Sequence, residues 1–172
     1  MYGGGARQDF GWYFEGKSSV SVTSIEEIQD WLVACEYAED MELFQEGDFW
    51  QHPRTFERLR RGDCEDHALW AWRKLVELGY DAELVSGQQL SESGGATIAS
   101  GHVWVVFKQG EETFVFETAA KSKDRMLKPL QSVRNEYRPE AGVDAARRRF
   151  AYYGYLLTMR ERRAPRKARR TA

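Results

Sequence analysis

The stretch Arg61-Gly62-Asp63-Cys64-Glu65-Asp66-His67 runs directly into the apolar segment 68–79. Asp63 is a favourable helix N-cap, Asp66 stands three residues later as in a variant of the capping box, and Gly79 is a typical residue to end a helix. We therefore predict a helix that begins at Cys64 and buries one face, made of Ala68, Ala71, Leu75 and Leu78. A cysteine in the first turn lies at the positive end of the helix macrodipole, where a reactive thiolate forms most readily.

Two further helices are predicted before this junction. Residues 24–27 form a capping box, which predicts a helix from Ile25 to Phe44 that holds Cys35 as a small core residue. Pro53 suits the first turn of a short helix that runs to Arg61 and is ended by Gly62. The chain therefore delivers Cys64 on a tight junction between two helices.

The segment after residue 79 alternates in the manner of strands. Residues 80–86, 102–107 and 113–117 are typical of strands, whereas residues 87–100, rich in Ser, Gly and Gln, predict a mobile loop. A hairpin turn centred on Gln109-Gly110 would place His102 directly opposite Glu117 on the same face. A carboxylate at that position can hold one N–H of an imidazole.

Cys64, His102 and Glu117 together form a candidate catalytic triad of nucleophile, base and orienting carboxylate. The alternative for each residue alone is a partly buried thiol and an ordinary sheet histidine. His67 is a rival base because it lies three residues from Cys64, but no carboxylate is placed to orient it, so packing or lining the cleft suits it better. Cys64, His67 and His102 could also bind zinc, but the paired spacings typical of zinc sites are absent.

The acids around the cysteine form a second candidate site. Asp63, Glu65 and Asp66 place three carboxylates within four residues, an oxygen-rich patch that suits Ca²⁺. Acids at a helix N-terminus also favour the macrodipole without any metal, and the sequence leaves both explanations open.

Length and composition indicate a folded domain. The chain has 172 residues with 42% hydrophobic residues and two cysteines, so it predicts a real core and no disulfide framework. We expect one domain over residues 1–158 and a basic disordered tail over residues 159–172, which could contact nucleic acid or an acidic partner or could simply be solvated. No apolar run of membrane-spanning length and no secretory pattern is evident, which predicts a cytoplasmic protein without a membrane partner.

The motifs together resemble a known family. Trp50-x-x-Pro53, the block Gly62-Asp63-Cys64-Glu65-Asp66-x-Ala68 and Gly101-His102-Val-Trp-Val, with Glu117 after it, are similar to the transglutaminase-like superfamily, nearest to its bacterial transglutaminase-like cysteine proteinases. The resemblance covers about residues 45–120. It implies a papain-like α+β fold in which the nucleophile's helix packs on an antiparallel sheet. It also implies that Cys64 is the nucleophile, that His102 is the base, and that Glu117 takes the place of the family's aspartate.

The resemblance also implies a chemistry. Some relatives bind calcium through acids that flank the nucleophile. Asp63 and Glu65 resemble those acids, so the resemblance implies a possible calcium site, and no other cofactor is expected. We expect acyl transfer on a protein or peptide substrate, as by a peptidase or amidase. The backbone N–H of Cys64 would be one oxyanion donor, and Trp50 or Gln51 a second. The alternatives are a transglutaminase-type amine transferase, which shares the triad, and a binding module that keeps the fold without catalysis.

Overall fold

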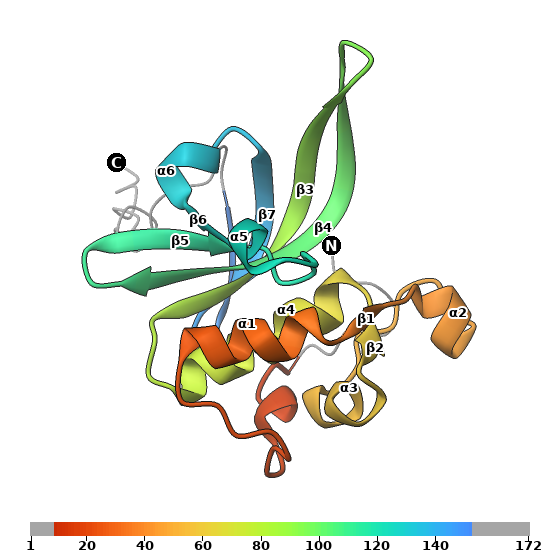
Figure 1. Ribbon diagram of the computed structural model, residues 1–172, viewed down its shortest axis with the longest axis vertical. Helices are drawn as coiled ribbons and strands as arrows, with labels where there is room; N and C mark the ends of the chain where they lie inside the picture. Colours follow the sequence, from red (N-terminus) through yellow and green to blue (C-terminus); the bar gives the residue numbers. More distant parts are fainter. Residues whose placement is uncertain (1–8, 153–172) are drawn as a thin grey trace, which may run out of the picture.

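A long helix, α4 (Cys64–Glu77), lies against one face of an antiparallel sheet in the computed structural model, which describes residues 9–152 (Figure 1). The six strands run in the order β6-β5-β4-β3-β7-β8. Their bounds are Ala82–Ser93 (β3), Ala96–Gln109 (β4), Glu112–Phe116 (β5), Leu127–Pro129 (β6), Tyr137–Val143 (β7) and Arg149–Ala151 (β8). The predicted tail, residues 159–172, lies outside the described residues. The arrangement confirms the predicted α+β class.

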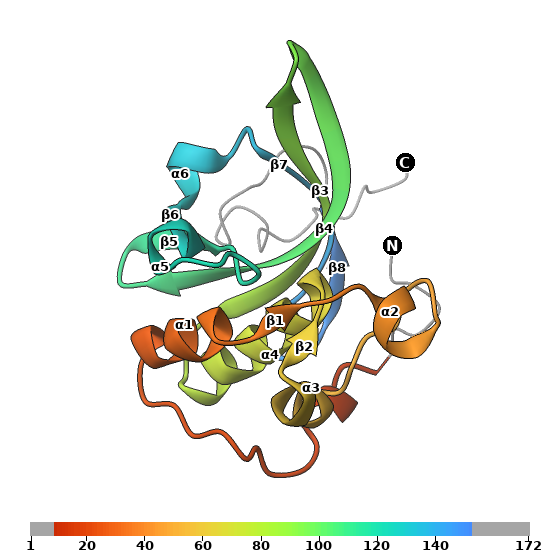
Figure 2. The same cartoon turned by 45° about the vertical axis from the view of Figure 1, so that its right-hand side comes forward.

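The remaining elements are η1 (Trp12–Phe14), α1 (Ile25–Val33), β1 (Glu36–Tyr37), α2 (Asp40–Phe44), α3 (Pro53–Leu59), β2 (Arg61–Gly62), α5 (Lys123–Met126) and α6 (Leu130–Val133). Of these, η1, α1, α3 and β2 contact α4, whereas α5 and α6 lie beside β5 and β6 (Figures 1 and 2). β1 and β2 form a small parallel sheet immediately before Cys64. No helix among residues 9–152 is long and apolar enough to cross a membrane.

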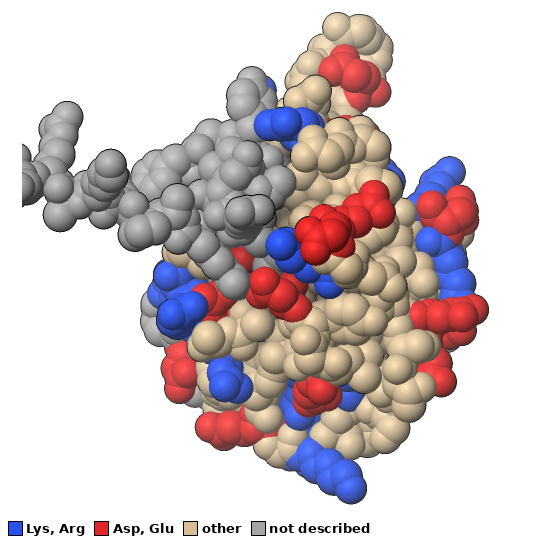
Figure 3. Space-filling model, turned by 90° about the vertical axis from the view of Figure 1, so that its left-hand side faces the viewer, with Lys and Arg blue, Asp and Glu red and all other residues tan. Residues whose placement is uncertain are grey.

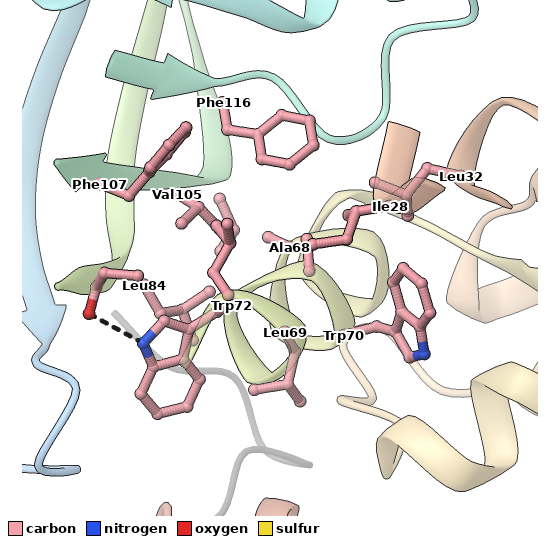
Figure 4. Packing of buried hydrophobic residues seen from close by; sticks show 14 of the residues in the cluster. Ile28, Leu32, Ala68, Leu69, Trp70, Trp72, Leu84, Val105, Phe107 and Phe116 are labelled. Carbon is pink, nitrogen blue, oxygen red and sulfur yellow. Dashed lines mark hydrogen bonds between the residues drawn. The ribbon is translucent and has the colours of Figure 1, made fainter. Parts of the chain in front are cut away.

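α4 is the centre of the core and is buried on all sides, from Glu65 to Leu75 (Figure 4). Trp70 stacks on Trp31 with ring centroids 3.9 Å apart, and the Trp72 indole N–H donates to the carbonyl of Ala82 at 3.2 Å. The sequence predicted that only one face of α4 is buried, whereas the helix is buried around its whole circumference from Glu65 to Leu75. The sheet covers one side of α4, and α1, α3 and the segment around η1 cover the rest, so that its polar residues are buried with partners.

Two of those polar residues, Arg73 and Lys74, tie the N-terminal segment to α4. The guanidinium of Arg73 donates to the carbonyls of Tyr13 at 3.0 Å and Gly16 at 2.7 Å. Lys74 lies 3.6 Å from the carboxylate of Glu57, and both side chains are almost fully buried. The pair is enclosed, so removing either charge alone would leave the other without its buried partner.

The sheet has a second apolar layer on the face away from α4. Val85, Trp104, Val106 and Val115 pack there with Tyr137 and α6. Because both faces are covered, residues 103–107 of β4 are all buried, and the strand reads as a continuous apolar run.

Three local predictions were wrong. The helix predicted over residues 25–44 breaks into α1, β1 and α2, because residues 36–37 pair with residues 61–62 of β2. α3 ends at Leu59, with Arg60 in the left-handed region at φ 54°. Gly62 is instead a strand residue whose missing Cβ leaves room for the Asp66 carboxylate. Cys35 is buried just after α1, as expected for a small core residue.

Residues 87–100, predicted as a mobile loop, extend β3 and β4 into a hairpin that rises from the body of the molecule (Figure 2). The pairing continues to Ser93 and Ala96 around a Gly94-Gly95 turn, where both glycines have positive φ. We call residues 88–101 the arm. Its Ser and Gly content suggested a loop, but the two halves pair with each other.

The β4–β5 register also differs from the prediction. Gln109 pairs with Glu112, so the turn is centred on Gly110-Glu111 and the register is shifted by two residues. Glu117 follows the end of β5, and extending the register would place it opposite Trp104 and diagonal to His102. A shift of two keeps the same face, which is why the two side chains still meet.

Candidate active site

A cavity of about 540 Å³ lies where the start of α4 meets β3 and β4. Its lining includes Cys64, His102, Trp50, Gln88 and Glu140, together with several acids of the 39–65 region. Two of the three predicted triad residues therefore face one cavity, and the third lies behind the histidine.

His102 is held by the Glu117 carboxylate. Its Nε2 lies 2.8 Å from Oε1 and 3.0 Å from Oε2, and both side chains are 12% exposed. Tyr137 donates its hydroxyl to Glu117 Oε2 at 3.0 Å, and Gln89 donates its amide at 3.3 Å. The carboxylate is thus fixed from three sides, and the bond at Nε2 leaves Nδ1 of His102 for another partner.

Cys64 is the first residue of α4 and is partly buried. Its thiol donates to Glu65 Oε2 at 3.2 Å, and Val103 lines the same cavity beside it. Val103 directly follows His102, so the sulfur lies against the strand that carries the base.

The electrostatics around the thiol reverse the sequence prediction. Burial raises the pKa of Cys64 above its ordinary value, and the carboxylates of Glu65 and Asp63 raise it further. A helix macrodipole contributes only a fraction of a charge, and the burial of the thiol outweighs it. Burial and the neighbouring acids therefore favour the thiol form of Cys64 over the thiolate.

The acids beside Cys64 belong to a larger cluster than the sequence indicated. Oxygens of Asp40, Asp63 and Asp66 lie within 4.8 Å of one another, and so do oxygens of Asp40, Asp48 and Glu65. Burial raises the pKa of each of Asp40, Asp63, Glu65 and Asp66. Among the described residues, Asp40 Oδ1 and Asp63 Oδ1 are buried without a hydrogen-bond partner.

This donor set fits a calcium ion. Ca²⁺ takes six to eight oxygen ligands at about 2.3–2.6 Å, so two ligand oxygens on one ion are at most about 5 Å apart. In each of the two groups of three residues, which share Asp40, one oxygen from each residue converges within that limit. The convergent groups in the described part of the chain contain no Cys or His, so the geometry gives the zinc alternative no support.

Two other predicted site residues, Trp50 and Gln51, have partners that limit their roles. Trp50 lines the cavity, but its indole N–H donates to Asp48 at 2.9 Å. Gln51 lies outside the lining and donates its amide to the Asp66 carboxylate and to the carbonyl of Arg61. In this arrangement both candidate second oxyanion donors are already engaged.

His67 lies in the core and not in the cleft. It is fully buried, its Nδ1 lies 2.7 Å from the carbonyl oxygen of Asp63, and burial lowers its pKa to about 4. Phe56 and Tyr37 pack on its ring. The histidine of the preceding loop, His52, caps α3 by accepting from the N–H of Arg54 and does not line the cavity.

Sequence reasoning missed the residues that tertiary contacts bring to the site. Asp40 and Asp48 come from α2 and the loop after it, and only their acidity hinted at a cation site. Gln89 and Tyr137, which hold Glu117, lie in β3 and β7 and belong to no local motif.

Comparison with known proteins identifies the fold. No family model matches the chain, and no curated protein matches its sequence. Among solved structures, calcium-bound LapG of Legionella pneumophila is 18% identical with a TM-score of 0.53, and the match covers 87% of this chain and 76% of LapG. EGTA-treated LapG gives the same identity and TM-score over 88% and 75% of the two chains. At this identity the likeness shows the fold alone, which is transglutaminase-like.

Proposed function

We propose that this protein is a cysteine peptidase or amidase that acts on a protein or peptide through Cys64, His102 and Glu117. The observation that carries the proposal is the pair of bonds from Glu117 to His102 Nε2 at 2.8 and 3.0 Å, next to a helix-start cysteine on the same cavity. An imidazole so held presents Nδ1 as the proton acceptor. The transglutaminase-like fold shared with LapG supports this assignment.

The reaction is acyl transfer in two stages. The proton of the Cys64 thiol passes to His102 Nδ1, and the sulfur attacks the amide carbonyl carbon, whose π electrons move to oxygen. The tetrahedral intermediate collapses, the C–N bond breaks, and His102 gives its proton to the departing amine. His102 then takes a proton from water, which attacks the thioester, and the C–S bond breaks to release the acid and the thiol.

Oxyanion stabilisation is assigned first to the backbone N–H of Cys64. It belongs to the first turn of α4, whose N–H groups have no partner within the helix. The engaged indole of Trp50 and amide of Gln51 would act only after losing their bonds to Asp48 and Asp66.

We further propose that Ca²⁺ is held by carboxylates of Asp40, Asp48, Asp63, Glu65 and Asp66. The ion would supply positive charge among acids that otherwise raise the pKa of Cys64. This proposal rests on the convergent oxygens of this chain, and it agrees with the calcium-bound form of LapG.

Peptide cleavage tests the function. A proteome-derived peptide library is incubated with the protein in calcium buffer, and new termini are identified by mass spectrometry. We expect cleavage by the wild type and by Cys35→Ala, and none by Cys64→Ala. Equal cleavage by Cys64→Ala would refute the proposal. A labelled primary amine in the same assay separates hydrolysis from amine transfer, because a transferase incorporates the label at the acyl position.

A further inference from the structure

The arm leaves one edge of β4 open. β3 pairs with β4 from Ala82 and Phe107 to Ser93 and Ala96, whereas β5 pairs with β4 only from Val105 onward. Residues 96–101 are exposed, and within the described chain no second strand covers β4 between residues 96 and 104. Figure 1 shows the two strands rising beyond the rest of the sheet.

The direction of the backbone groups on this edge follows from the pairing. The N–H of Lys108 donates to Asp81, on the β3 side, and the N–H of Leu90 in β3 points away from β4, to Glu136. Because successive backbone groups of a strand alternate in direction, the odd-numbered residues of β4 face away from β3. Val105 and Phe107 therefore face β5, and Thr97, Ala99 and Gly101 direct their N–H and C=O groups to the open edge.

The open edge leads to the nucleophile. Val103 is the next residue in the odd-numbered series, and it lines the same cavity as Cys64 and His102. Thr97 lies six residues before it, about 20 Å along an extended strand. A polypeptide strand laid along Thr97, Ala99 and Gly101 would thus continue to the sulfur, beside His102.

The composition of the edge leaves it available for pairing. Exposed edges are usually protected by Lys, Pro or a bulge, but β4 reads Ala96-Thr-Ile-Ala-Ser-Gly101 with neither charge nor proline. The register from Ala96 to Phe107 is continuous, without a bulge. Figure 3 shows the arm at the top of its face, largely uncharged with acidic atoms near the tip. Small side chains leave the backbone groups accessible.

We propose that the open edge of β4 at Thr97, Ala99 and Gly101 binds an extended segment of the peptide substrate as an added strand, which delivers its scissile carbonyl to Cys64. The inference rests on the proposed peptidase function and specifies its substrate class. The substrate is a locally unfolded segment recognised through backbone hydrogen bonds. A helical segment, or one with proline at a bonded position, is excluded because it offers no matching row of N–H groups.

Proline substitutions on the two edges of the arm test the idea. Thr97→Pro removes an N–H from the proposed binding edge. Glu92→Pro removes one from the opposite edge at the paired position, and both variants lose the Thr97–Glu92 hydrogen bond of 2.7 Å. A decapeptide cleaved in the library assay is the probe. We expect kcat/KM for the decapeptide to fall about 10-fold or more in Thr97→Pro and less than about 3-fold in Glu92→Pro, given one lost hydrogen bond plus local strain.

Single N-methylation of the decapeptide backbone gives an independent readout. We expect an N-methyl group to lower the cleavage rate only when it stands at alternate residues on one side of the scissile bond, because only every second amide faces β4. Equal loss in both proline variants, or N-methyl effects without a period of two, would overturn the edge proposal.

Two controls separate the possible failures. A small p-nitrophenyl ester is too short to contact the arm, so its hydrolysis measures the reactivity of Cys64 alone. The rate of this hydrolysis should be unchanged in Thr97→Pro. If Thr97→Pro cleaves the decapeptide as fast as the wild type does, the edge proposal fails and the peptidase function stands. If the wild type cleaves neither ester nor any library peptide, both proposals fail. A dimer that Thr97→Pro dissociates without loss of cleavage would show that the edge binds a second copy, which also contradicts the proposal.

Discussion

The hydrogen bond between His102 and Glu117 should raise kcat by a measurable factor. Glu117→Gln keeps the size of the side chain but removes the charge that faces Nε2 at 2.8 and 3.0 Å. A hydrogen bond to a charged group contributes about 1.5–3 kcal/mol. At about 1.36 kcal/mol per tenfold change in rate, its loss predicts a fall in kcat of about 10- to 150-fold. KM should change little, because the carboxylate lies behind His102 and away from the substrate.

The assay is steady-state cleavage of a peptide from the library, in calcium buffer. Glu140→Gln is the matched control, because Glu140 lines the same cavity but has no bond to His102 among the described contacts. We expect that control to keep kcat within about 3-fold, because an exposed carboxylate contributes little. A Glu117→Gln enzyme with more than about a third of the wild-type kcat, or an equal loss in Glu140→Gln, would refute an orienting role for this carboxylate.

Three further predictions concern the side-chain length of Glu117, the proposed calcium site and the buried Lys74–Glu57 pair. Glu117→Asp shortens the side chain by about 1.5 Å, and its kcat should fall about as far as that of Glu117→Gln. Calcium at about one hundred times its Kd should add about 2.7 kcal/mol to the free energy of unfolding. In calorimetric scans, Tm should then be about 5–10 °C higher in calcium than in EGTA. This rise should be lost in Asp40→Asn and kept in Asp30→Asn. Burial raises the pKa of Glu57, but hydrogen bonds from Ser18, Ser19 and Trp70 outweigh burial and leave the pKa below its ordinary 4.5. Its stabilisation is therefore complete above that value and is lost as pH falls through the lower, folded-state pKa. Urea unfolding of Glu57→Gln should show a deficit of about 3 kcal/mol at neutral pH that narrows below about pH 4.5; a constant deficit would contradict this.

The sequence predicted the elements of the site better than their surroundings. A cap residue, a helix period and a glycine stop are local signals, and they placed the start of α4 at Cys64 correctly. The pairing of His102 with Glu117 was predicted from the wrong register. It survived because an error of two residues preserves the face of a strand, whereas an error of one would have separated the pair.

What the sequence could not supply was set by contacts between distant segments. Asp40 and Asp48 join the acids of α4 only because β1 pairs with β2 and brings the preceding chain alongside. The thiol pKa was predicted from one helix end, yet burial and, after it, the neighbouring acids raise the pKa instead. Residues 87–100 looked like a loop by composition, but pairing depends on the partner strand as well as on composition.

The central claim is that Cys64 is a nucleophile activated by His102, and its alkylation rate tests this most directly. The protein is treated with iodoacetamide at neutral pH in calcium buffer or in EGTA, and labelling of Cys64 and Cys35 is followed by mass spectrometry. We predict that Cys64 in calcium reacts faster than N-acetylcysteine and that EGTA or His102→Ala slows it about 10-fold or more, since the thiolate is then lost. Cys35, buried in the core, should react slowly throughout. A Cys64 that reacts no faster than N-acetylcysteine in calcium, at a rate unchanged by His102→Ala, would contradict the account.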